Sequence, residues 1–156
     1  MIRFSTGLRN AIAAEFGLGV MMNGGVMRVY GGTMPDSPDR APGTSLLGMI
    51  TTEGKIFYHS SDPNDAGLLL QLVSPGTLLN YGDWRLTGSG TGNATWFRWH
   101  WAWEDDLGES EYYPRIDGDV GLHDSLAALR LSSVSITPTT NRLLEQFLLM
   151  LPMEGT

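Results

Sequence analysis

The 156-residue chain has no cysteine and only one lysine, Lys55. Disulfide bonds, thiolate metal sites and a cysteine nucleophile are therefore excluded. Ten basic residues stand against 17 acidic ones, which gives a formal net charge of −7. Proteins that bind nucleic acids neutralise phosphates with many basic side chains. We therefore expect no nucleic-acid partner.

Long apolar runs are absent as well. The first ten residues, MIRFSTGLRN, lack the apolar stretch of about 7–15 residues that a secretion signal contains. No run approaches the roughly 18 consecutive apolar residues that indicate a membrane-spanning helix. We therefore expect a protein that is made in the cytoplasm and has no membrane partner.

The usual motifs of catalysis and metal binding are missing too. The chain has neither a GxSxG nucleophile elbow nor a glycine-rich phosphate loop ending in GK[ST]. Its three histidines, His59, His100 and His123, lack ligands at metal-site spacing. The segment DGD at 117–119 resembles half of a calcium loop, although a turn between strands explains it equally well. We predict no enzymatic activity, no catalytic residue, no metal and no cofactor.

Glycine and proline are plentiful, with 20 and 8 copies, and they separate short apolar segments. Several short strands at intervals of about 8–12 residues are typical of a β-sandwich or barrel. The apolar run at 68–73 is too short to distinguish a strand from a helical turn. Neither a linker nor a repeat interrupts the pattern, so we expect one domain spanning 1–156. The predicted strands cover 26–30, 46–51, 55–59, 83–87, 95–103, 112–116, 126–131, 134–136 and 143–151.

One short helix is predicted near the N-terminus, over residues 5–16. Leu8, Ile12 and Phe16 recur at four-residue spacing, which places them on one helical face. Ser5 or Thr6 is a suitable N-cap, and the glycines at 17 and 19 are expected to end the helix.

The most distinctive segment is TWFRWHWAW at 95–103, which contains four of the five tryptophans. Its period-two alternation predicts a strand. Such an aromatic strand can be sandwich core, a protein interface or a platform for carbohydrate. Our candidate interface residues come from this strand and from the predicted helix: Trp96, Trp99, Trp101, Trp103, Leu8, Ile12 and Phe16.

Five segments resemble small structural proteins that tailed bacteriophages encode among their head genes. In chain order they read STGLRNAI, GGVMRVYGGTMPDSPDRAPGTSLLGMI, GSGTGNATWFRW, RIDGDVG and FLLMLP. Together they are distributed over nearly the whole chain. The most specific are the YGGTMP segment, the ATWFR strand and the RIDGDVG segment.

The resemblance implies a virion component and, more specifically, a capsid cement or decoration protein on the capsid surface. It implies an all-β, jelly-roll-like β-sandwich with one short N-terminal helix and no catalytic residues. The expected partners are the major capsid protein and further copies of the chain, as a homodimer or homotrimer. Two alternatives stay open: a neck or tail connector or adhesin module, and a carbohydrate-binding module that uses the strand from Trp96 to Trp103.

Overall fold

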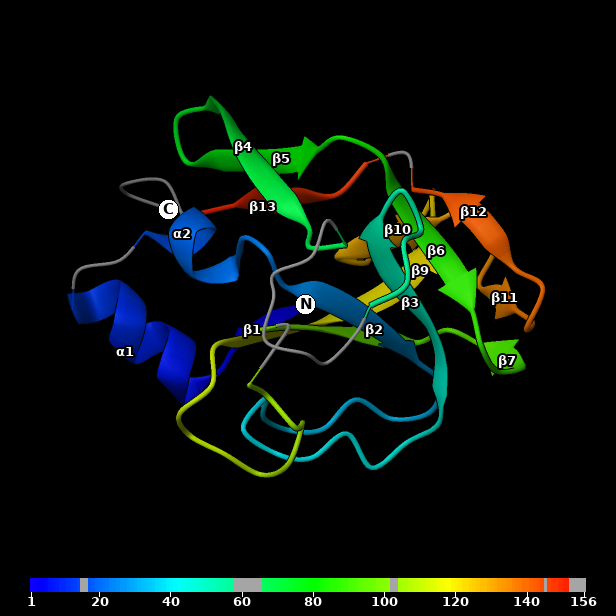
Figure 1. Ribbon diagram of the computed structural model, residues 1–156, viewed down its shortest axis with the longest axis horizontal. Coiled ribbons are helices and arrows are strands. Elements are labelled where there is room, and N and C mark those ends of the chain that lie inside the picture. The colour runs from blue at the N-terminus through cyan, green and yellow to red at the C-terminus, as the bar shows by residue number, and fades with distance from the viewer. Residues whose placement is uncertain (15–16, 58–65, 102–103, 145, 152–156) are drawn as a thin grey trace.

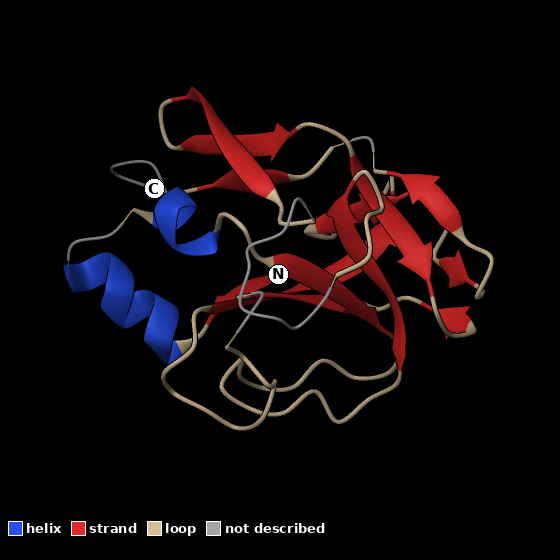
Figure 2. Cartoon of the chain, in the orientation of Figure 1, coloured by secondary structure: helices blue, strands red, loops and turns tan. Residues whose placement is uncertain are grey.

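The computed structural model describes residues 1–14, 17–57, 66–101, 104–144 and 146–151. Strands dominate these residues, and almost all strand pairs are antiparallel (Figure 2). The exception is a parallel pair between β9 and the short strand β10 (Leu129–Leu131). The expected all-β fold class is therefore confirmed.

The largest sheet runs through the centre of the molecule in the order β1-β9-β8-β2-β3-β6-β12, with β10 added beside β9. Its strands are neighbours in space although they are far apart in sequence. Their bounds are Ile2–Phe4 (β1), Arg115–Leu122 (β9), Trp96–His100 (β8), Val26–Tyr30 (β2), Leu46–Thr52 (β3), Trp84–Gly88 (β6) and Asn141–Leu143 (β12).

Within the described part of the chain, two smaller sheets accompany the main one. One contains β7 (Gly92–Asn93) and β11 (Ser135–Ile136). The other has the order β13-β5-β4, with bounds Leu148–Met150, Thr77–Tyr81 and Leu69–Ser74. Figure 1 shows this three-stranded sheet along the side of the molecule that lies away from the long loop at 31–45.

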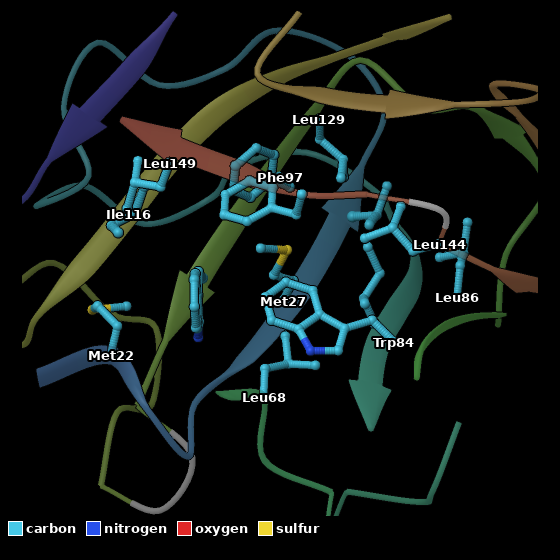
Figure 3. Packing of buried hydrophobic residues seen from close by; sticks show 14 of the residues in the cluster. Met22, Met27, Leu68, Trp84, Leu86, Phe97, Ile116, Leu129, Leu144 and Leu149 are labelled. Atoms are coloured by element: carbon cyan, nitrogen blue, oxygen red, sulfur yellow. The ribbon is translucent and has the colours of Figure 1, made fainter. Parts of the chain in front are cut away.

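The hydrophobic core lies where the three-stranded sheet meets one face of the main sheet. Phe147, just before β13, contacts three aromatic rings of the main sheet. Its ring centroid lies 5.7 Å from that of Trp84 and 5.9 Å from those of Phe97 and Trp99. Figure 3 shows the surrounding aliphatic residues filling the space between these strands. The two sheets thus share one buried layer, as in a sandwich.

Among the described residues, two helices occupy the N-terminal region where the sequence predicted one. The first, α1, covers Thr6–Ala14, and the Ser5 Oγ accepts a hydrogen bond from the Leu8 N–H at 3.1 Å, as an N-cap does. Gly17 does not simply end the helical region, because it is the N-cap of α2 (Leu18–Met22). Three residues of α2 are buried, so tertiary packing outweighs the low helix propensity of Gly19.

The RIDGDVG segment also differs from expectation. It forms strand β9 rather than a turn, because its residues pair with β8 on one side and β1 on the other. The predicted strand at 143–151 is likewise interrupted: β12 ends at Leu143 and β13 begins at Leu148. The predicted strand at 55–59 is not found in its described part, 55–57. The run at 68–73 is mostly strand, in β4.

Gly118 provides a test of the packing between β9 and β8. It lies opposite Phe97, and a Cβ atom at Gly118 would come within 2.6 Å of the Phe97 ring. We expect Gly118→Ala to lower the free energy of unfolding by about 1–3 kcal/mol, because the buried ring would have to move. Gly19→Ala is the steric control: a Cβ there meets nothing within 4 Å, and the higher helix propensity of alanine should leave the domain at least as stable as the native chain. Urea denaturation of the native chain and of both variants measures their free energies of unfolding. A Gly118→Ala variant that is as stable as the native chain would contradict this packing.

Candidate functional site

The tryptophan strand is an interior element. Trp96 and Trp99 are fully buried on β8, and Leu8 of α1 is equally buried. These three candidate interface residues therefore form no exposed surface, which corrects the expectation. Ile12 is exposed, and Trp101 is half-buried. Phe16 and Trp103 lie outside the described residues.

Both faces of β8 are covered, for different reasons. Trp99 faces the core, 5.5 Å from the Trp84 ring. Trp96 faces the opposite way and stacks on Tyr30, with ring centroids 4.3 Å apart. Its indole N–H donates to the Thr44 hydroxyl at 3.2 Å. Residues of the same chain therefore cover the aromatic side chains on both faces of β8. Trp96 and Trp99 offer no ring face to a sugar.

The second face of the main sheet carries a row of charged side chains. Arg28 pairs across strands with Arg98, and Arg98 pairs with Asp117. The Arg98 guanidinium donates two hydrogen bonds of 2.7 Å to the Asp117 carboxylate, and both side chains are fully buried. This bidentate geometry is the strongest arrangement available to an arginine and a carboxylate.

A second buried ion pair lies beside the first. Arg115, on β9, donates to the Asp105 carboxylate at 2.7 Å and 2.6 Å. Asp105 comes from the loop at 104–114 and also accepts the Leu107 N–H at 2.8 Å. Both partners of the ion pair are fully buried. The sequence did not predict this pair: Arg115 follows the loop directly, and only the fold turns the Asp105 side chain back onto it.

The two arginines also bind the loops that cover this face. Arg98 donates to the carbonyl oxygen of Arg40 at 2.7 Å. Arg115 donates to those of Pro38 at 3.0 Å and Gly108 at 2.8 Å. The loops at 31–45 and 104–114 are thereby attached to the main sheet by charge-assisted hydrogen bonds. The buried charges thus hold loops in place.

His100 completes the polar cluster in its neutral form. Its Nδ1 lies 2.6 Å from the Trp101 carbonyl oxygen, and its Nε2 accepts a hydrogen bond from the Arg28 Nε at 3.1 Å. These contacts assign the proton to Nδ1. Burial and the nearby Arg28 charge lower the pKa of His100 to about 3. Burial also raises the pKa of Asp117, although the Arg98 guanidinium opposes this effect.

The most unusual exposed feature is the outer face of the β4–β5–β13 sheet, which we call the outer sheet face. Leu70 is buried against the core, so the alternate residues of β4 point outward. The cross-strand registers place the corresponding residues of β5 and β13 on the same side. The outer sheet face consists of Leu69, Gln71, Val73, Thr77, Leu79, Tyr81, Leu148 and Met150.

Most of these side chains are apolar and reach solvent. The exposed fractions are 57% for Tyr81, 60% for Met150 and 50% for Val73. At the tip of the β4–β5 hairpin the inward-pointing Leu72 is also exposed, by 71%. The hairpin therefore presents apolar side chains on both of its faces at this end.

Charged residues are missing from this sheet. None occurs from Ala66 to Gly82 or from Gln146 to Leu151, in a chain with 27 charged residues (10 basic plus 17 acidic). This absence of charge is visible in the sequence as a long uncharged interval. The hydrophobic pattern alone did not reveal the surface, because buried and exposed apolar strands look alike until their neighbours are known.

No group of three or more histidine, aspartate or glutamate side chains in the described ranges is placed to hold a metal ion. Of the described helices, neither is long and apolar enough to cross a membrane. No family model, curated protein or solved structure matches the chain.

Proposed function

We propose that the chain is a structural protein of a tailed-phage particle, most specifically a cement protein on the capsid surface that binds and stabilises the lattice of the major capsid protein. The observation that supports this proposal is the outer sheet face. Exposed apolar patches that are rimmed by polar residues often mark sites of protein–protein interaction. A function based on protein contact accounts for a surface without charge.

The buried polar face supports the same proposal. A cement protein has to present its contacts in a fixed geometry to many identical subunits. The Arg98–Asp117 and Arg115–Asp105 pairs attach two long loops to the main sheet and so restrict their movement. The phage-like segments include β8, β9 and the loop at 31–45, which meet at these arginines. A jelly-roll arrangement of the strands belongs to this proposal as a prediction.

The number of copies per particle tests the proposal. Quantitative mass spectrometry of purified particles, with the major capsid protein as internal standard, should find hundreds of copies of the chain, because cement follows the symmetry of the shell. Roughly a dozen copies would instead indicate a ring at the neck or tail. Absence from the particle would contradict a virion role altogether.

The carbohydrate alternative now depends on one described residue. Trp101 is half-buried, and its indole N–H donates to the Met21 carbonyl oxygen at 2.5 Å. Glycan binding that disappears in Trp101→Ala, while the folded state is kept, would favour a carbohydrate-binding module. Trp99→Ala is unsuitable for this purpose, because removal of a buried indole destabilises the core by about 3–5 kcal/mol.

A further inference from the structure

We infer that a pocket beside Trp101 binds the positively charged group of an organic cation, an alkylated ammonium or a guanidinium. The pocket has a volume of about 250 Å³ and lies between α1, α2 and the loop at 104–114 (Figure 1). The inference does not rest on the proposed capsid function. Side chains that line the pocket include Asn10, Ala11, Met21, Trp101, Glu111 and Tyr112.

The chemistry of these walls selects a cation. Trp101 is half-buried and Tyr112 is 70% exposed, and the faces of both ring types attract cations. Glu111 supplies a carboxylate and Asn10 an amide oxygen. None of the described residues that line the pocket is basic, and Arg9, the only basic residue of α1, is hydrogen-bonded within its own helix. An anion would therefore meet no counter-charge, and a neutral ligand would gain nothing from the carboxylate.

The surroundings of the pocket favour positive charge as well. The chain has a formal charge of −7, and the loop at 104–114 contains five acidic residues. Desolvation raises the pKa of Tyr113, and the neighbouring carboxylates of Asp106, Asp105 and Glu104 raise it further. The loop thus resists a further negative charge. The same field draws a cation towards the pocket.

The walls of the pocket are held in place by the fold. The Ser5 hydroxyl, directly before α1, donates to the Tyr113 carbonyl oxygen at 2.8 Å. A Cβ atom at Gly7 would overlap the backbone of the same loop, so α1 packs directly on it. The Trp101 indole N–H donates to the Met21 carbonyl oxygen at 2.5 Å, which ties the ring to α2. A ligand therefore does not have to order these walls when it binds.

Titration of the purified, isotope-labelled chain with choline tests the inference. The control ligand is dimethylbutanol, the neutral isostere in which carbon replaces the ammonium nitrogen. The reporter is the Trp101 indole N–H signal in nitrogen–proton correlation spectra, assigned with Trp101→Phe. At constant ionic strength, choline should shift this signal with a dissociation constant in about the millimolar range, at least about fivefold tighter than the alcohol.

A second cation identifies the source of the charged group. N-acetyl-arginine methylamide carries the guanidinium of a protein side chain, whereas choline represents a free quaternary ammonium compound. Tighter binding of the arginine compound would assign the pocket to a side chain of a partner protein. Tighter binding of choline would assign it to a free small cation.

Three variants connect the binding to the pocket. Glu111→Gln and Tyr112→Ala change exposed side chains and should each weaken choline binding by about three- to tenfold while the domain stays folded. Glu104→Gln removes the same charge from the same loop but lies outside the lining of the pocket. It is the matched control and should bind choline within about twofold of the native chain.

Three results would overturn the inference. They are a Trp101 signal that does not move up to about 50 mM choline, equal affinity for choline and dimethylbutanol, and unchanged affinity in Glu111→Gln. A shift with methyl glucoside but not with choline would also overturn it and would favour the carbohydrate alternative. None of these results changes the number of copies in the particle, so the inference and the proposed function fail independently.

Discussion

Arg115→Met is expected to lower the free energy of unfolding by about 3–5 kcal/mol, because it leaves the Asp105 carboxylate buried without a counter-charge. The change also removes the hydrogen bonds to the carbonyl oxygens of Pro38 and Gly108. Chemical denaturation near neutral pH measures the loss. A loss below about 1 kcal/mol would show that this pair is accessible to water, and it would contradict the buried arrangement.

Two companion variants make this experiment specific. Arg40→Met removes an exposed ion pair with Glu109, and such surface pairs contribute about 0–1 kcal/mol. The double change Arg115→Met with Asp105→Leu removes both buried charges. It should recover part of the lost stability, since the main cost of the single change is the unpaired carboxylate. No recovery would mean that the hydrogen bonds to the loops contribute more than the charge pair.

The second large effect is a loss of stability in mild acid through His100. Its pKa is about 3 in the folded state and 6.5 in the reference state, so between these values the unfolded chain binds a proton that the folded chain does not. The stabilisation is therefore complete above pH 6.5 and decreases as the pH falls towards 3. We expect a loss of about 2 kcal/mol between pH 7.5 and pH 5.

His100→Gln should remove this pH dependence, whatever it does to the absolute stability. His123→Gln changes an exposed histidine and is the matched control, which should keep the slope of the native chain. Burial raises the pKa of Asp117, so this group binds a proton more readily in the folded state and opposes the acid effect at lower pH. The measurement is made between pH 5 and pH 7.5, across the reference pKa of histidine. An equal slope in the native chain and in His100→Gln would contradict the neutral, buried histidine.

Much of the fold was predictable because short-range patterns determine it. Period-two alternation identified β8, glycine-bounded apolar segments identified β2 and β3, and four-residue spacing identified α1. The second helix was missed because burial of Leu18, Met21 and Met22 stabilises it against two glycines. The RIDGDVG strand was missed because local turn chemistry favours Asp-Gly in a loop, whereas pairing with β1 and β8 extends it.

The candidate site was less predictable, for a physical reason. Exposure is a property of the folded chain, and an aromatic strand such as Trp96 to Trp99 looks the same whether loops cover it or a partner does. The covering loops are held by Arg98 and Arg115, whose partners lie up to 77 residues away in sequence. The outer sheet face needed the three-strand register before its apolar residues could be assigned to one side.

The most direct test of the proposed function is a cryo-electron microscopy map of the particle in which the chain is made. The proposal predicts repeated density for this domain on the outer surface of the capsid shell, related by the symmetry of the lattice. In that density the β4–β5–β13 sheet should face a neighbouring protein subunit and be shielded from solvent. A shell without the domain, or a domain whose outer sheet face points into solvent at every position, would contradict the account.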